Sequence, residues 1–147
     1  MTSIIESVED SPLISVPHIA PTKRNERYIT KSICFNAAAM ADTIDAKAVT
    51  TLTNSGYTAF QISAWRPKSH ILVFTSNHRI LTQLNLLWGV KSFFYDKFVS
   101  TDDTVTDINK MAQDRGFVTK GDFLINLAAM PVTEKGMVNT LRVSEIE

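Results

Sequence analysis

The run Ala46–Pro67, AKAVTTLTNSGYTAFQISAWRP, constrains the fold of this chain more than any other stretch. It opens with a short β-branched segment at residues 48–52, which is typical of a buried strand. Small turn-forming residues follow at 53–56, and Pro67 ends the run. Between them, apolar residues recur three or four apart and predict a helix: Tyr57, Phe60, Ile62 and Trp65. A strand, a turn and a helix in this order form half of a parallel α/β unit, which binds ligands at the carboxyl end of its strand.

The turn between this strand and this helix has the chemistry of an anion site. Backbone N–H groups at a helix start lack intrahelical partners and carry partial positive charge, so a phosphate suits this position. Gly56 lets the backbone come close to a ligand, and hydroxyls are available from Thr53, Ser55 and Thr58. The alternative is purely structural: Asn54 or Ser55 caps the helix and Gly56 makes the turn.

The rest of the chain alternates strands with helices. Further helices are predicted at Asn25–Asp45, Arg79–Trp88 and Thr101–Arg115. Further strands are predicted at His70–Ser76, Val90–Tyr95, Phe123–Ala128 and Thr140–Ile146. The last two strands follow each other without a helix, which indicates a mostly parallel sheet whose final strand is antiparallel. We therefore expect an α/β three-layer sandwich with about five strands.

The loop between the last two strands contains Lys135 and Gly136. The crossover rule sends this loop and the first turn to the same edge of the sheet. Lys135 and Gly136 are therefore expected to face Ser55, Gly56 and Thr58 across one cleft.

The first predicted helix carries one apolar stripe and a close-packing surface built from Cys34 and Ala37–Ala39. Core packing is the ordinary explanation of such a stripe. We also expect weak self-association through the alanine-rich surface of this helix. Asn25 is placed to cap the helix, and Glu26 suits its positive N-terminus.

Charge and cysteine usage restrict the partners and the compartment. Fifteen basic and fifteen acidic residues cancel, so nothing favours nucleic acid or an anionic membrane, and any phosphate site must be local. The single cysteine, Cys34, excludes an internal disulfide and fits a reducing cytosol. The sequence has no signal-peptide pattern and no long apolar run, which favours a cytoplasmic location.

No set of residues in the sequence predicts catalysis or metal binding. The three histidines, His18, His70 and His78, are scattered, whereas metal sites need clustered ligands. Asp102 and Asp103 lie at a predicted helix start, where the helix dipole explains two acids. We expect no catalytic residue, no metal site and no cofactor in this chain.

The run LTNSGYTAFQISAWRP resembles the C-terminal α/β domain of pyruvate kinase, where a Leu-Thr-x-Ser-Gly-x-Thr stretch leads to Arg-Pro. The resemblance continues in the same order through FTSNHRILTQLNLLWGV, STDD, KGD and MVNTLRV, and it spans Glu26 to Ile146. It implies a domain for regulation and oligomerisation, with partners in the rest of the enzyme chain and in other subunits of a homo-oligomer, a tetramer in the full-length enzyme. Phosphoryl transfer from phosphoenolpyruvate to ADP, with Mg and K, takes place in a separate barrel in that family, so this chain alone is expected to be inactive.

The resemblance also implies a site for a sugar phosphate effector. The matching positions are Thr53, Asn54, Ser55, Gly56, Tyr57 and Thr58 in the turn, with Lys135 and Gly136 in the last loop. Two regions depart from the family pattern: residues 104–106 lack the usual basic residue, and the last loop carries Glu134. Tyr57 and Phe60 also add bulk beside the turn. A monophosphate effector, or no effector, fits these departures.

Residues 1–24 resemble the tail of a preceding barrel helix followed by a linker that contains several prolines. Residues 25–147 are predicted to form the α/β domain. We therefore expect the chain to be a piece of a longer enzyme, with Met1 as an internal residue or an expression start. Two alternatives stay open. The chain could be a stand-alone sensor of a phosphorylated ligand that begins at Met1, or an interaction module whose effector turn is vestigial.

Overall fold

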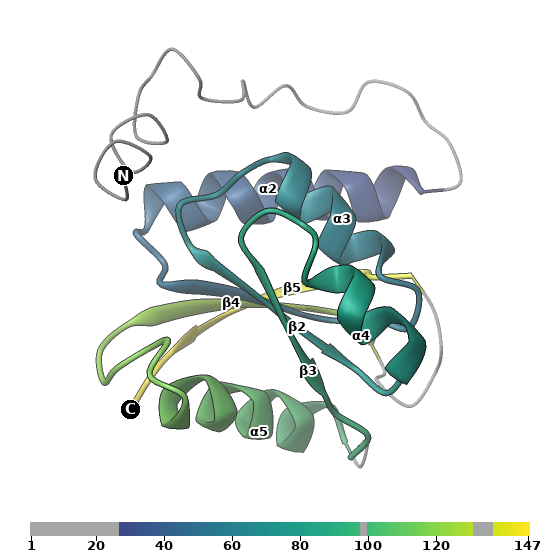
Figure 1. Cartoon of the computed structure of the whole chain (residues 1–147). Helices are drawn as coiled ribbons and strands as arrows, with labels where there is room; N and C mark the ends of the chain where they lie inside the picture. The colour runs from purple at the N-terminus through teal and green to yellow at the C-terminus, as the bar shows by residue number, and fades with distance from the viewer. Residues whose placement is uncertain (1–26, 98–99, 131–136) are drawn as a thin grey trace, which may run out of the picture.

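The computed structural model shows a five-stranded sheet with helices on both faces (Figure 1). It describes residues 27–97, 100–130 and 137–147. The helices are α2 (Tyr28–Thr43), α3 (Tyr57–Ala64), α4 (His78–Leu84) and α5 (Thr101–Asp114). The strands are β1 (Ala48–Leu52), β2 (His70–Thr75), β3 (Val90–Phe94), β4 (Phe123–Ala128) and β5 (Thr140–Glu145). The predicted linker at residues 1–24 and the predicted cap Asn25 lie outside the described residues. None of the described helices is long and apolar enough to cross a bilayer.

The strands follow the order β3-β2-β1-β4-β5, which places the first strand of the chain at the centre of the sheet. Ala48 pairs in parallel with His70 of β2 on one side and with Leu124 of β4 on the other. The outer strand β5 runs antiparallel to β4, with Val143 opposite Ile125. The predicted α/β class, with a mostly parallel sheet and an antiparallel last strand, is confirmed.

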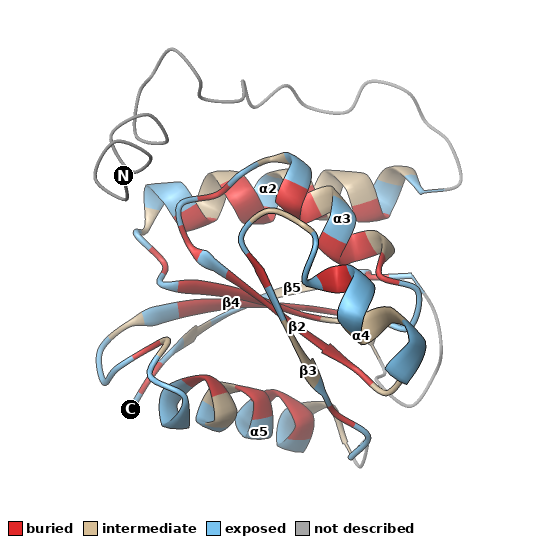
Figure 2. Ribbon diagram, viewed as in Figure 1, coloured by how far each residue is buried: buried red, intermediate tan, exposed pale blue. Residues whose placement is uncertain are grey.

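The core has two layers because the central strands are buried on both faces. Helices α2, α3 and α4 cover one face and α5 covers the other (Figure 1). Side chains of the first layer include Val49, Ile71 and Val73, and those of the second include Leu72 and Leu124. Figure 2 shows the buried residues concentrated along the sheet and the helix faces that meet it. Burial on both faces explains why the sequence shows continuous apolar runs in these strands.

Helix α3 buries its small residues, and helix α4 is shorter than predicted. Helix α3 buries Thr58, Ala59, Ile62 and Ser63, whereas the side chain of Phe60 is 58% exposed. Helix α4 ends at Leu84, before the predicted end at Trp88, because the chain then turns through a bond from the Leu87 N–H to the Leu84 carbonyl at 3.1 Å. The small residues of α3 allow it to lie close to the sheet, and the large Phe60 is left at the surface.

Helix α5 begins at the predicted residue, Thr101, and carries the two predicted acids in its first turn. The Ser100 hydroxyl accepts the Asp103 N–H at 3.1 Å, so Ser100 caps the helix and Thr101 is its first residue. Asp102 and Asp103 lie in the first turn, where the helix dipole favours them. Asp102 also pairs with Arg142 of β5 at 2.8 Å. A cation therefore does lie beside this helix start, although the sequence around residue 104 contains none.

Candidate functional site

The turn between β1 and α3 lies at the carboxyl edge of the sheet and is held by bonds within itself. The Gly56 N–H donates to the Thr53 hydroxyl at 2.9 Å, and the Tyr57 N–H donates to the Ser55 hydroxyl at 3.4 Å. The Thr53 N–H donates to the Phe74 carbonyl of β2 at 3.0 Å, which anchors the turn to the sheet. Gly56 precedes α3 with φ of 82°, a left-handed conformation that strongly favours glycine. The turn is therefore fixed in shape before any ligand is considered.

Asn54 connects this turn to the neighbouring turn that follows β2. Its backbone carbonyl accepts the Asn77 side-chain amide at 3.1 Å, and its side-chain oxygen accepts the Ser76 hydroxyl at 3.5 Å. Asn77 in turn caps α4 by accepting the Arg79 N–H at 3.0 Å. The two helix starts at this edge are therefore tied together, and Asn54 has a structural task whether or not a ligand binds.

The predicted hydroxyl donors differ in their access to solvent. Ser55 is exposed, whereas Thr58 is 4% exposed and lies on the inward face of α3. Thr53 is half-buried, and both its hydroxyl and that of Ser55 accept a backbone N–H within the turn. Ser55 is thus the hydroxyl best placed to meet an external anion.

Lys135 and Gly136 lie outside the described residues, so the predicted cleft between them and the turn stays a prediction. The described flanks of their loop agree with the expected edge. Thr51 of β1 pairs in parallel with Leu127 of β4, so the two strands end side by side.

Arg27 joins the turn from a distant part of the sequence. Its guanidinium carbon lies 4.0 Å from the centre of the Tyr57 ring, which is a cation–π contact. This contact brings a positive charge to the start of α3, where the helix dipole is also positive. Sequence reasoning missed Arg27 because the chain separation between Arg27 and Tyr57 gives no local pattern that pairs them.

A groove of about 360 Å³ runs from Arg27 and the turn along the space between α3 and α4. Its lining residues are Arg27, Ser55, Gly56, Tyr57, Phe60, Ile80, Gln83, Leu84 and Leu87. Gly56 lines this groove without a side chain: a Cβ atom there would lie 3.1 Å from the Leu84 Cδ2 atom and 3.9 Å from the Ile80 Cδ1 atom. The absence of a side chain at Gly56 thus lets α4 pack directly against the turn.

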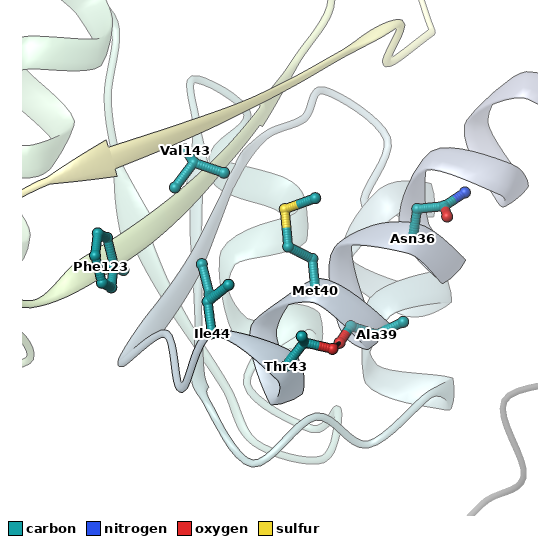
Figure 3. Close-up of a pocket in the computed structure, with 7 residues that line it drawn as sticks. All are labelled: Asn36, Ala39, Met40, Thr43, Ile44, Phe123 and Val143. Carbon is teal, nitrogen blue, oxygen red and sulfur yellow. Dashed lines mark hydrogen bonds between the residues drawn. The ribbon is translucent and has the colours of Figure 1, made fainter.

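A second groove, of about 430 Å³, lies between α2 and the β4–β5 edge of the sheet. Figure 3 shows Met40 and Ile44 of the α2 region across from Phe123 of β4 and Val143 of β5. Phe123 is 39% exposed and Val143 is 43% exposed, and β5 forms hydrogen bonds with β4 alone within the described sheet. This groove has the features of a contact surface: apolar walls beside an open strand edge.

Most of the alanine-rich surface of α2 is buried, and only Ala39 reaches the groove beside β4 and β5. Cys34, Ala37 and Ala38 are all fully buried against the protein's own sheet. Core packing therefore explains them. Burial also raises the pKa of the Cys34 thiol to about 12, so this thiol stays protonated and unreactive near neutral pH.

The ionisable side chains of the described part of the chain form no metal-binding group. No three His, Cys, Asp or Glu side chains gather there in a group that could hold a metal ion. His78 stacks on Phe94 with ring centres 4.1 Å apart. Asp107 accepts the Tyr95 hydroxyl at 3.1 Å, and burial, with that hydrogen bond to Asp107, raises the pKa of Tyr95. These contacts are structural.

Comparison with known proteins gives a consistent family. Residues 31–144 match the family model described as "Pyruvate kinase, alpha/beta domain". The chain is 32% identical over 130 residues to the pyruvate kinase of Clostridium acetobutylicum, covering 88% of this chain and 28% of that protein. It is 36% identical over 129 residues to the pyruvate kinase of Geobacillus stearothermophilus, covering 85% of this chain and 21% of that protein.

A solved structure shares the fold. The crystal structure of a pyruvate kinase from Cryptosporidium parvum superposes with a TM-score of 0.74 at 21% identity, over 86% of this chain and 24% of that one. The chain thus spans between a fifth and three tenths of the length of these relatives.

Proposed function

The chain belongs to the pyruvate kinase alpha/beta-domain family, and we propose that it is the regulatory and oligomerisation domain of a pyruvate kinase. The whole enzyme would transfer phosphate from phosphoenolpyruvate to ADP in the cytoplasm, with Mg and K. In the described residues of this chain, no three His, Cys, Asp or Glu side chains form a group that could hold a metal ion. Residues outside this chain would therefore supply that chemistry, and we expect the chain alone to form no pyruvate from phosphoenolpyruvate and ADP.

The regulatory part of the proposal is an anion site at Thr53–Thr58. One observation carries it: the exposed Ser55 and the start of α3 open onto a groove that also holds the guanidinium of Arg27. A phosphate there would meet the positive end of the α3 dipole, the Ser55 hydroxyl and the Arg27 guanidinium together. Lys135 and Gly136 are proposed to close the site from the last loop.

Thermal unfolding in the presence of sulfate or a sugar phosphate tests this site. We expect either anion to raise the Tm of the wild type and to leave that of Ser55→Asp unchanged, because the new carboxylate fills the anion site and repels the anion. Aspartate is favoured near helix starts, so the variant should fold. Thr82→Asp adds the same charge on the exposed side of α4 and should respond like the wild type. Equal responses of wild type and Ser55→Asp would leave the turn with a structural role only.

The oligomerisation part of the proposal rests on the groove between α2 and the β4–β5 edge. Its exposed apolar side chains and the open edge of β5 favour contact with a second copy, which would bury both. This surface replaces the alanine-rich face of α2 that the sequence suggested for self-association. It would also serve if the chain were an interaction module with no effector.

A further inference from the structure

The groove between α3 and α4 has two chemically different ends. Arg27 and the start of α3 make one end positive. The other end and the walls are apolar: Phe60 comes from α3, and Ile80, Leu84 and Leu87 come from α4 and the turn after it. A ligand that fits such a groove carries an anion at one end and an apolar body at the other.

We propose that this groove binds a phosphate monoester whose alcohol part is aromatic or otherwise apolar. The inference rests on the proposed anion site at the turn and adds the class of molecule attached to that anion. The phosphate would lie beside Arg27 and Ser55, and the body would lie along Phe60 and Leu87.

The shape and polarity of the walls disfavour a sugar bisphosphate. Among the described residues that line the groove, Arg27 is the only cation, so a second phosphate would meet no matching charge there. Gln83 supplies the only side-chain amide of this described lining, and most hydroxyls of a sugar would face apolar walls without partners. A volume of about 360 Å³ is at the small end of the range for ligand sites, which suits a compact monoester.

The aromatic wall is held in place by contacts that do not need a ligand. The guanidinium of Arg27 covers one face of the Tyr57 ring. Tyr57 and Phe60 are three residues apart on α3 and therefore lie on one side of the helix. The exposed Phe60 ring offers a stacking surface for an aromatic body, which would account for a large apolar side chain left in solvent.

Direct binding of 1-naphthyl phosphate tests the inference, measured by calorimetry on the purified full chain beside inorganic phosphate and fructose 1,6-bisphosphate. We expect naphthyl phosphate to bind the wild type at least tenfold more tightly than either. Arg27→Gln should weaken naphthyl phosphate binding about tenfold, since it removes a charge-assisted contact. Phe60→Ala should weaken naphthyl phosphate several-fold and leave inorganic phosphate unchanged. Arg79→Gln removes the same charge from an exposed residue outside the lining and is the control for net charge.

The outcomes separate this inference from the site proposed at the turn. Tighter binding of fructose 1,6-bisphosphate, abolished by Ser55→Asp but unaffected by Phe60→Ala, overturns the ligand class and keeps the anion site. Binding of 1-naphthol as strong as that of its phosphate also overturns the ligand class, because the positive end would then contribute nothing. If none of the three phosphates binds, both the inference and the anion site are wrong.

Discussion

Gly56 is the residue on which the candidate site depends most, for two separate reasons. Its φ of 82° strains any residue with a side chain, and its missing Cβ leaves room for Leu84 of α4. The sequence predicted a turn at Gly56 but not the contact with α4, because that contact joins segments that no local pattern relates. Ser55 and Asn54 show the same limit: both were predicted as site residues, and only the structure shows that Asn54 ties two turns together.

Gly56→Ala should lower the free energy of unfolding by about 2 kcal/mol or more, because left-handed backbone strain adds to the contact with Leu84. Gly116→Ala is the matched control. Gly116 has a φ of 80°, and no described atom lies within 4 Å of the place its Cβ would take, so only the strain of about 1 kcal/mol should appear. Urea unfolding of the two variants measures the difference, and equal losses would show that the Leu84 contact adds no cost.

Cys34 gives the chain a measurable pH dependence at high pH. Burial raises its pKa from 9.0 to about 12, so the folded state keeps the proton that the unfolded state loses above pH 9. The resulting stability is fully present below pH 9 and is lost as the pH rises from 9 to about 12. At about pH 10.5 the loss from this thiol should be about 2 kcal/mol.

Urea unfolding of wild type and Cys34→Ala at a series of pH values checks this expectation. The variant should be less stable at pH 8 because a cavity replaces the sulfur, but its stability should fall less between pH 8 and 10.5. Tyr95, whose pKa is also raised, contributes equally to both proteins and cancels in the comparison. Parallel pH profiles would contradict a buried, protonated thiol.

At the scale of the elements, the strands were predictable and the helix faces were not. Strands β1 and β4 have the predicted bounds, because apolar runs between turn-forming residues leave little choice for a chain buried on both sides. The apolar spacing predicted helix α3 but did not show that Phe60 lies at the surface, because the sheet accepts the small residues of this helix at close range. A polar residue within the apolar run of β4, Asn126, was a signal that sequence reasoning left unused.

Asn126 organises a buried network that joins β1, β4, β5 and α5. Its side-chain amide donates to the Thr50 hydroxyl at 2.8 Å and to the Asn109 side-chain oxygen at 3.0 Å. Its oxygen accepts the Ser144 hydroxyl at 2.9 Å. Asn126 is only 3% exposed, so water cannot easily replace these bonds.

Asn126→Leu should therefore lower the free energy of unfolding by about 2–3 kcal/mol, since it leaves buried polar partners unsatisfied. Ser144→Ala removes one bond and should cost about 1 kcal/mol. Chemical denaturation of both variants measures the two losses. A loss for Asn126→Leu no larger than that for Ser144→Ala would mean that the network does not act as a unit.

At the scale of the whole molecule, the fold and the family could be predicted, but the two grooves could not. The alternation of strands and helices predicted the sheet and its antiparallel end. The grooves depend on contacts between side chains from different helices and strands. Arg27 contacts Tyr57, and Met40 lies across from Val143 (Figure 3). Such contacts are set by tertiary packing and cannot be read from the spacing of residues along the chain.

Self-association through the groove between α2 and β5 is expected to depend on Val143. Sedimentation at rising concentration should show a dimer of the wild type. Val143→Glu should weaken the dimer about tenfold or more, because the dimer would bury an unpaired charge. Gln113→Glu adds the same charge on the exposed side of α5 and should associate like the wild type. A wild type that stays monomeric at high concentration, or a Val143→Glu variant that associates equally well, would contradict this use of the groove.

The central position of β1 also sets the order in which a chain leaving the ribosome can complete its sheet. Strands β1, β2 and β3 are close in the sequence and can pair early, but the β1 edge at Ala48 stays open until Leu124 of β4 is synthesised. Pairings between distant segments slow folding, and an unpaired strand edge invites association with other chains. A nascent chain halted after α5 would therefore expose one edge of its central strand, β1. Pairing with β4 covers that edge and removes this site of aggregation.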